Sequence, residues 1–310
     1  MRFAHMEKKS PFSSVVTGNL ACLLAYVIFG FNIVFCKNIA NSGTVSPMAL
    51  YCMRTIGALI LFWAVSLLDP KLRSEKVDLK DMWKIAIASM LGLFGTQLAF
   101  LKAITMTTAI DASILSLLSP IVTMIVAAIV IKDKISGRSI LGLTLSLCGV
   151  VFLIFNTVSI RSGADHTTIG GILMMLVNTC SFACYVGIFK PLIQKYSVVT
   201  FMKWMFVFST IYALPFGVKD LLAVDYAAMP ASIAVQVGFV VVCATFIAYF
   251  LVPVGQKRLR PMIVGMYSYV QPVIAMVISL AIGLDSFTWP KLAATVLVFL
   301  GVGIVNFAKK

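Results

Sequence analysis

Residues 117–136 read LLSPIVTMIVAAIVIKDKIS, and residues 269–288 read YVQPVIAMVISLAIGLDSFT. Each stretch is an apolar run with a proline near its start, Pro120 in the first and Pro272 in the second. Each also reaches an aspartate, Asp133 or Asp285, at the same distance beyond its proline. Because a helix needs roughly 20 mostly apolar residues to cross a bilayer, one membrane-length segment occurs twice in this chain.

The composition of the whole chain indicates a membrane protein. Hydrophobic residues make up 61% of the 310 residues and charged residues only 12%, and the mean hydropathy is +1.03. A soluble domain has about 25% charged residues and too little interior to bury this much apolar surface. The net charge of +14 does not predict nucleic-acid binding, because the basic residues lie in short loops and not on one face.

The apolar runs that are long enough to cross a bilayer are continuous, which favours helices over the alternating strands of a barrel. Ten such runs cover nearly the whole chain and leave no room for a soluble domain. The predicted fold is therefore an all-α polytopic membrane protein. Its ten transmembrane helices are expected at residues 16–37, 47–68, 83–104, 109–131, 139–157, 169–190, 199–218, 231–255, 262–283 and 289–307.

The lysines and arginines in the loops predict the orientation of the chain, because cytoplasmic loops carry the excess of these residues. Nearly all of them fall on one side of the predicted membrane, together with those near both termini. The other side holds only Arg161, Lys219 and Lys291. We therefore expect both termini in the cytoplasm, which agrees with an even number of spans.

The similarity between the two halves extends beyond the two opening stretches. FNIVFCK at residues 31–37 is similar to CYVGIFK at residues 184–190, and Gly149-Val150 corresponds to Gly301-Val302. A nearly constant spacing across several helices favours a duplication over chance similarity between apolar helices. We expect five-helix repeats at residues 1–157 and 169–310, with a linker at 158–168. Because five is odd, the second repeat enters the membrane from the opposite side, as in secondary transporters with inverted repeats.

A family resemblance is carried by residues 101–154, which read LKAITMTTAIDASILSLLSPIVTMIVAAIVIKDKISGRSILGLTLSLCGVVFLI. This stretch resembles the signature of EamA-type transporters in the drug/metabolite transporter (DMT) superfamily. The positions that fit are Lys102-Ala103-Ile104, Thr107, Ala109, Pro120, Asp133, Ser136, Gly142 and Gly149-Val150, and in the second half Pro272, Asp285, Thr288 and Gly301-Val302. Aspartate replaces the usual glutamate of the family in both halves, and Asp111 is unusual at its helix start.

The resemblance covers nearly the whole chain, although its motifs say little about the substrate. It implies ten helices in two inverted five-helix repeats, and transport of small organic metabolites without ATP. The expected location is a bacterial cytoplasmic (inner) membrane, with amino acid or metabolite efflux as the kind of activity.

Charged residues inside the spans are the first functional candidates, because a charge in the membrane is costly. Arg54 lies near the centre of its span and is expected to contact substrate or act in gating; its alternative role is to bind buried carbonyls. Lys37 and Lys102 lie near outer helix ends, where their side chains can extend to the headgroups, with gating as the alternative. Asp111 either pairs with Lys102 or stabilises its helix start, or it binds a coupling proton or cation.

Neutral polar residues and prolines give further candidates. Asn178, Ser181 and Tyr185 share one face of the helix at 169–190, and Tyr267 and Gln271 share a face of the helix at 262–283. These five residues are expected to line a wet cavity or, alternatively, to form hydrogen bonds between helices. Pro120 and Pro272 each remove a backbone hydrogen bond, so we expect a kink that shapes the cavity and serves as a bending point; alternatively, the freed carbonyls bind substrate.

Together these features favour a secondary-active transporter of small organic metabolites that works by alternating access. Three cations against one acid near or within the spans point to a substrate with a carboxylate, such as an amino acid or organic acid. A membrane-embedded enzyme or a receptor is the alternative; His5 and His166 lie outside the spans, and no HExxH or Walker A motif occurs. No cofactor or metal is expected. The coupling proton or cation and the oligomeric state are left open.

Overall fold

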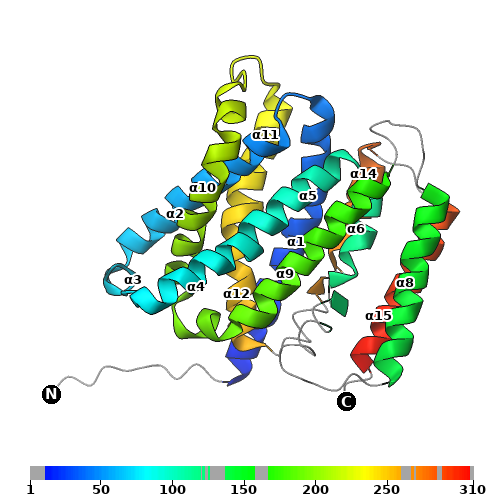
Figure 1. Ribbon diagram of the computed structural model, residues 1–310, viewed down its shortest axis with the longest axis horizontal. Coiled ribbons are helices and arrows are strands. Elements are labelled where there is room, and N and C mark those ends of the chain that lie inside the picture. Colours follow the sequence, from blue (N-terminus) through cyan, green and yellow to red (C-terminus); the bar gives the residue numbers. More distant parts are fainter. Residues whose placement is uncertain are drawn as a thin grey trace.

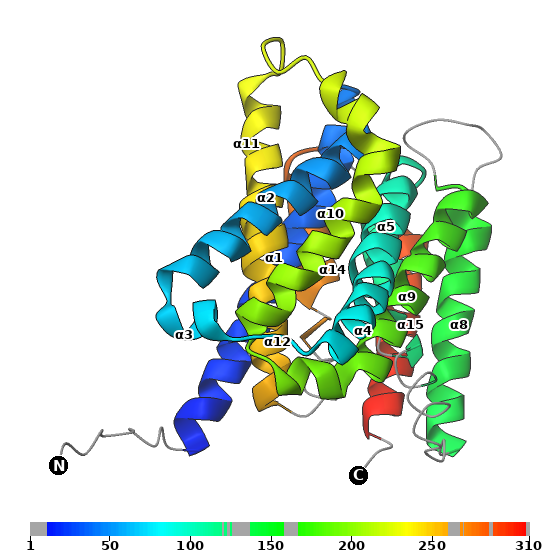
Figure 2. The same ribbon diagram turned by 60° about the vertical axis from the view of Figure 1, so that its left-hand side comes forward.

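The computed structural model describes residues 11–119, 121, 122, 125, 137–157, 167–259, 267, 268, 270–284 and 288–307. The elements of this part of the chain are helices, packed into one bundle (Figures 1 and 2). In chain order they are α1 (Pro11–Ser42), α2 (Pro47–Leu68), α3 (Pro70–Ser74), α4 (Leu79–Ser89), η1 (Met90–Gly95), α5 (Thr96–Thr105), α6 (Ala109–Ser116), α8 (Gly137–Thr157), α9 (Ile169–Lys195), α10 (Val198–Leu222), α11 (Ala231–Phe239), η2 (Val240–Ile247), α12 (Ala248–Arg258), α14 (Val270–Ala281) and α15 (Trp289–Phe307).

The all-helical fold predicted from the sequence is confirmed for the described residues, and every predicted span contains helix. Helices long and apolar enough to cross a membrane lie at Val15–Ser42, Pro47–Leu68, Leu79–Thr105, Ile169–Phe189, Val198–Leu222 and Ala231–Arg258. Shorter apolar helices lie at Ile140–Gly149, Val270–Ala281 and Leu292–Gly301. The count of ten crossings therefore stays a prediction.

Short polar side chains fix where several of these helices begin. Ser46 precedes α2 and accepts a hydrogen bond from the Ala49 backbone N–H at 3.1 Å, while Pro47 occupies the first helical position. Ser197 and Thr168 cap α10 and α9 in the same way. A hydroxyl at this position satisfies an N–H group that has no partner within the helix, so these beginnings are encoded locally.

Two of the long helices contain a wider, π-helical segment near the middle. The segment η1 joins α4 to α5, and η2 joins α11 to α12. They occupy the third span of each predicted repeat, so they correspond in position. Segments of this kind are rare and occur frequently at functional sites. Neither segment was predicted from the sequence.

The helices α2 and α10, which correspond in the two predicted repeats, run in opposite directions. At one end Ser46, before α2, donates a hydrogen bond to Asp220, near the end of α10, at 2.6 Å. At the other end Lys203, near the start of α10, donates to Ser66, near the end of α2, at 2.9 Å. The two helices therefore lie antiparallel along most of their length.

The two helices that contain the π segments are antiparallel as well. Tyr196 accepts hydrogen bonds from Lys257 at the end of α12 and from the Asp78 backbone before α4. At the opposite end, α1 contacts both helices: Lys37 donates to the Ile104 carbonyl of α5 at 3.3 Å, and Asn38 donates to Gln236 of α11 at 3.0 Å. One helix therefore begins where the other ends.

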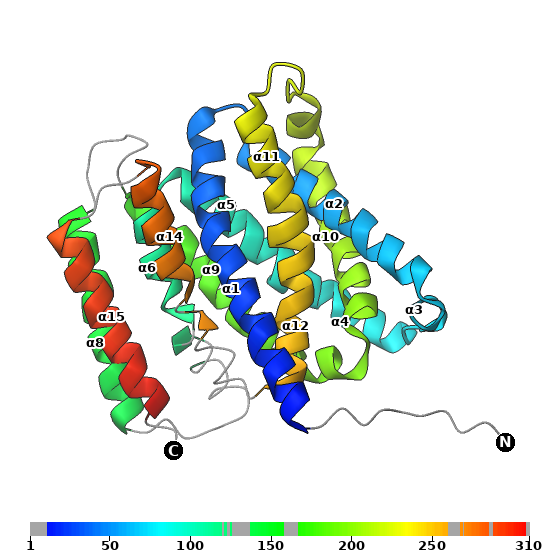
Figure 3. The ribbon, with the colours of Figure 1, turned by 180° about the vertical axis from the view of Figure 1, so that it is seen from behind.

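The packing of the bundle is nearly unchanged when the two halves are exchanged. The first helix, α1, packs against α12 and α14, and its counterpart α9 packs against α5 and α6. In the same way α2 packs against η2, and α10 packs against η1. Figure 3 shows α1 and α12 side by side, and Figure 1 shows the pair α8 and α15 at one edge of the bundle.

Candidate functional site

A cavity of about 120 Å³ lies between helices of both halves. Helices α1, α2, α5 and α6 contribute side chains from the first half, and α9, α12 and α14 contribute from the second. Most of the lining residues carry a polar group, and Phe29, Phe100 and Phe182 add apolar rings. The remaining lining residues are Tyr26, Asn32, Arg54, Thr96, Gln97, Ser116, Ser119, Asn178, Thr179, Tyr249, Ser268 and Gln271.

Arg54 is the cation of this cavity. It is 2% exposed, and its Nε donates to Thr245 Oγ1 at 2.8 Å while its Nη1 lies 3.9 Å from the Cys36 sulfur. Cys36 in turn contacts Asn32 Oδ1 at 3.5 Å. The ion pairs of the described residues lie at another site, so within this part of the chain no carboxylate neutralises the guanidinium.

The π segment η2 positions the partner of Arg54. Thr245 donates its hydroxyl proton to the Val240 carbonyl at 2.7 Å, which leaves its oxygen lone pairs for the Arg54 Nε–H. Gly57 brings α2 close to η2, because a Cβ at Gly57 would lie 2.3 Å from a methyl group of Val241. Close approach at a glycine is a common way to pack helices in membranes. Arg54 is thereby held at the cavity.

The start of α5, directly after the other π segment η1, contributes Thr96 and Gln97 to the cavity, and Asn178 of α9 contacts it. Asn178 Nδ2 donates to the Thr96 carbonyl at 2.7 Å, and Thr96 Oγ1 donates to the Gly92 carbonyl at 2.7 Å. Gln97 is 3% exposed. Its amide oxygen and nitrogen satisfy no hydrogen bond of ordinary geometry, although the Tyr249 side chain lies beside it.

The structure separates the five neutral polar residues that the sequence grouped as candidate lining residues. Asn178 and Gln271 line the cavity, whereas Ser181, Tyr185 and Tyr267 lie outside its lining. The Tyr185 ring packs against Gly92 and the Ser181 hydroxyl lies beside Gly95, both in η1.

Tyr267 occupies a third environment. It donates to Asn19 Oδ1 near the start of α1 at 3.1 Å.

The charged candidates near the outer helix ends occupy unlike environments. Lys102 is exposed, as expected for a side chain that extends to the headgroups. Lys37 is not: it is 2% exposed and donates to the Ile104 carbonyl, because α5 ends beside it. Asp111 is fully buried, and its carboxylate accepts a hydrogen bond from the Thr167 hydroxyl. Its backbone N–H donates to the hydroxyl of Thr108, which caps α6. None of the ion pairs of the described residues joins Asp111 to Lys102.

The two candidate prolines cannot be compared, because Pro120 lies outside the described residues. Pro272 is buried in the first turn of α14, just after Ser268 forms a turn. A proline in the first turn removes no hydrogen bond that the helix needs. Pro272 therefore lies near the beginning of α14, and its role as a bending point stays a prediction.

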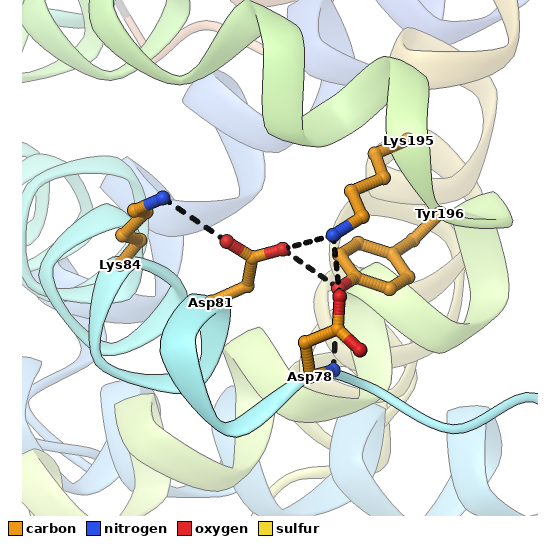
Figure 4. A network of polar contacts seen from close by, with 5 residues as sticks. All are labelled: Asp78, Asp81, Lys84, Lys195 and Tyr196. Atoms are coloured by element: carbon orange, nitrogen blue, oxygen red, sulfur yellow. Dashed lines mark hydrogen bonds and ion pairs between the residues drawn. The ribbon is translucent and has the colours of Figure 1, made fainter.

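A charged network lies at the end of the bundle where α4 begins and α9 ends (Figure 4). Asp81 accepts hydrogen bonds from Lys195 at 2.6 Å, from Tyr196 at 2.8 Å and from Lys84 at 3.1 Å. Lys195 also donates to Asp78 at 2.6 Å, and Asp78 and Asp81 raise the pKa of Lys195 above its usual value. Sequence reasoning missed this network, since its members lie in loops and helix ends where lysine and aspartate are common.

The bundle of apolar helices around a polar cavity defines a multi-pass integral membrane protein. The model of the EamA-like transporter family matches residues 16–155 and again residues 169–307. This chain therefore belongs to the EamA-like transporter family, as its resemblance to EamA-type transporters suggested, and it is a membrane transporter.

Several relatives carry transporter names. The chain is 22% identical to the uncharacterized transporter YetK of Bacillus subtilis, over 74% of this chain and 70% of YetK. It is 24% identical to the uncharacterized inner membrane transporter YicL of Salmonella typhimurium, over 93% of this chain and 95% of YicL. A protein of known crystal structure shares the fold with a TM-score of 0.62 at 17% identity, over 96% of this chain and 98% of that one.

Proposed function

We propose that this protein is a secondary-active transporter that works by alternating access between two inverted five-helix repeats, residues 1–157 and 169–310. The antiparallel arrangement of α2 and α10 supports the inversion. So does the exchange of packing partners between the halves. Two repeats of this kind can open a shared cavity to either side by rocking against each other.

The proposed topology has ten crossings in a bacterial inner membrane, with both termini in the cytoplasm. Helix α1 begins and α15 ends at the same end of the bundle (Figure 1), which supports termini on one side. The excess of loop lysines and arginines on that side supports the cytoplasm. We call this the inner end, and the opposite end the outer end.

The substrate is a small organic compound with a carboxylate, such as an amino acid or organic acid. The observation that carries this proposal is the Arg54 guanidinium, buried in the cavity without a carboxylate partner among the described residues. A buried charge is costly unless it is paired, and a guanidinium binds a carboxylate through two parallel hydrogen bonds. A bound substrate carboxylate would supply that pair.

Uptake into proteoliposomes tests this proposal, with a library of small metabolites and an Arg54→Ala variant. We expect wild-type uptake of a carboxylate compound and a loss of about tenfold or more in the variant, because hydrogen bonds between charged groups are the strong ones. Arg258→Ala is the matched control, since it removes an exposed arginine at the end of α12. Carboxylate uptake by Arg54→Ala at the wild-type rate and affinity would show that the anion site is wrong.

Asp111 is the proposed site of a coupling proton or cation. It is fully buried on α6, which packs against α1, and a buried acid inside a span is a candidate proton relay. Asp111→Asn should abolish dependence on a proton gradient, whereas Asp225→Asn, which removes an exposed carboxylate, should not. Gradient-driven uptake that is unchanged in Asp111→Asn would rule this role out. Gating by Lys37, Lys102, Pro120 and Pro272 stays a prediction.

A further inference from the structure

We infer that Gln97 contacts the substrate and selects acids that carry a hydroxyl or amino group beside the carboxylate. The inference rests on the proposed function, because it narrows the substrate class of the same cavity. Arg54 would bind the carboxylate, and the Gln97 amide would form a hydrogen bond with the hydroxyl or amino group.

The hydrogen bonding of Gln97 is the first reason. Its side chain lines the cavity, and the residue is 3% exposed. Both polar atoms of its amide are buried, and neither makes a hydrogen bond of ordinary geometry. The polar side chain that interacts with the amide is Tyr249, which also lines the cavity and leaves the second polar atom of the amide for another partner. Buried polar groups in folded proteins are nearly always paired, and an exception calls for an explanation such as a functional role. A substrate group in the cavity would supply the partner that the amide lacks.

A comparison with Asn178 shows that this is not a general property of amides in the cavity. Asn178 also lines the cavity, but its Nδ2 donates to the Thr96 carbonyl at 2.7 Å. That bond fixes the chain at the end of η1, so Asn178 has a structural partner. Gln97 follows Thr96 directly and has no comparable bond. The two amides therefore differ in role although they lie close together.

The π segment η1 explains how Gln97 comes to line the cavity. Each residue added to a helix rotates everything beyond it by roughly 100°, because an α-helix has 3.6 residues per turn. The wider turns of η1 end one residue before Thr96, so they set the direction of Gln97. Gly92 and Gly95 let Tyr185 and Ser181 of α9 pack closely against η1, which holds the segment in place.

The hydrogen-bonding groups of Arg54 and Gln97 limit which functional groups the substrate can carry. A guanidinium only donates hydrogen bonds, so it suits a carboxylate, whereas a glutamine amide both donates and accepts. A hydroxyl matches both functions, and an ammonium group matches the amide oxygen. An acid without a second polar group would leave the Gln97 amide unpaired in the bound state, and sites built to bind such a group reject analogues that lack it.

Counterflow in proteoliposomes with pairs of acids of one carbon skeleton tests the inference. Suitable probes are lactate and alanine against propionate, and phenyllactate and phenylalanine against phenylpropionate. Wild type should prefer the substituted acid of a pair by roughly tenfold or more. Gln97→Leu should reduce that preference to less than about threefold and keep the transport of the unsubstituted acid, which remains dependent on Arg54. Gln97→Met, of similar length, serves if Gln97→Leu does not fold.

A variant that retains only one function of the amide sharpens the test. Gln97→Glu accepts hydrogen bonds but carries a charge when ionised, so it should favour alanine over lactate and phenylalanine over phenyllactate. Equal loss for both members of every pair in Gln97→Leu and Gln97→Met would mean a structural role and would overturn the inference. A wild type that does not discriminate would also overturn it. If no acid shows transport that depends on Arg54, the proposed function fails first, which is a different result.

Discussion

Two junctions of the bundle occupy corresponding positions but are held by different chemistry. The inner junction joins the start of α4 to the end of α9, and the outer junction joins the start of α11 to the end of α1. Exchange of the two halves converts one into the other. The inner junction has the network around Asp81, with bonds to Lys195 at 2.6 Å and Tyr196 at 2.8 Å. The outer junction has one amide–amide bond, from Asn38 to Gln236 at 3.0 Å.

Further contacts lie at both junctions. At the inner junction Ser197 donates from both its backbone and its hydroxyl to Glu75, and Lys257 donates to the Tyr196 carbonyl. At the outer junction the corresponding contacts are those of Lys37 with the Ile104 carbonyl at 3.3 Å and of Ser46 with Asp220 at 2.6 Å. Aromatic rings add to them, with the Phe35 and Phe239 centroids 5.0 Å apart. The two junctions therefore differ chiefly where the third span of one half meets the first span of the other. That contact is an ion-paired network around Asp81 at the inner junction and a neutral amide–amide bond of Asn38 at the outer junction.

The difference has a consequence for alternating access. Hydrogen bonds between charged groups are shorter and roughly twice as strong as those between neutral groups, so separation of the inner junction should require more free energy. In a transporter with equivalent halves, the energy difference between the two access states comes from such asymmetries. We expect the inner junction to set the resting state, with the cavity closed toward the cytoplasm.

The largest expected effect is that of Asp81→Asn, which removes the acceptor that Lys195, Tyr196 and Lys84 share. Hydrogen exchange of the full-length protein in nanodiscs, followed by mass spectrometry, should show roughly tenfold faster exchange in peptides from the start of α4 and the end of α9. Peptides from the outer junction are the internal control. Equal acceleration at both junctions would indicate general destabilisation and contradict the role of the network.

The helices could be predicted from the sequence because length and hydropathy determine them. The range 47–68 was predicted to the residue for α2, since Ser46-Pro47 and Asp69-Pro70 stop the helix on both sides. Arg54 could be singled out because a charge in an apolar span is conspicuous, and the structure places it in the cavity. The position of a charged residue along a membrane helix can therefore be predicted from the sequence.

The direction in which a side chain points was harder to predict. The residues of η1 and η2, MLGLFG and VVVCATFI, have no polar pattern that distinguishes a π segment from an α-helix. Gln97 follows η1, so its place in the cavity could not be derived from helical spacing. Tyr185 shares a face with Asn178, but its ring packs on Gly92. Lys37 was expected to reach the headgroups, and only the position of α5 explains its burial.

A medium effect is expected when the chemistry of the inner junction is transferred to the outer one. Asn38→Lys combined with Gln236→Glu places an acid in the helix that begins at the junction and a cation in the helix that ends there, as Asp81 and Lys195 do at the inner junction. Exchange in outer-junction peptides should slow by a few-fold, because a partly buried ion pair is worth about 1 kcal/mol. Each single variant should lack this effect, so equal protection in a single variant would contradict the pairing.

The smallest expected effect is that of Lys84→Gln, which removes the most distant of the three donors to Asp81. Lys84 donates to Asp81 at 3.1 Å, and it lies on the same helix three residues away. A pair within one helix contributes little and connects no second element, so Lys84→Gln should change inner-junction exchange by less than about twofold. Lys195→Gln, which removes bonds that connect α9 to both Asp78 and Asp81, should accelerate it by several times more. If the two variants behave alike, simple loss of positive charge at the inner end explains the result, and the connection between α4 and α9 does not. If only Lys195→Gln has a large effect, the bonds that cross between the two halves are the ones that hold the inner junction closed.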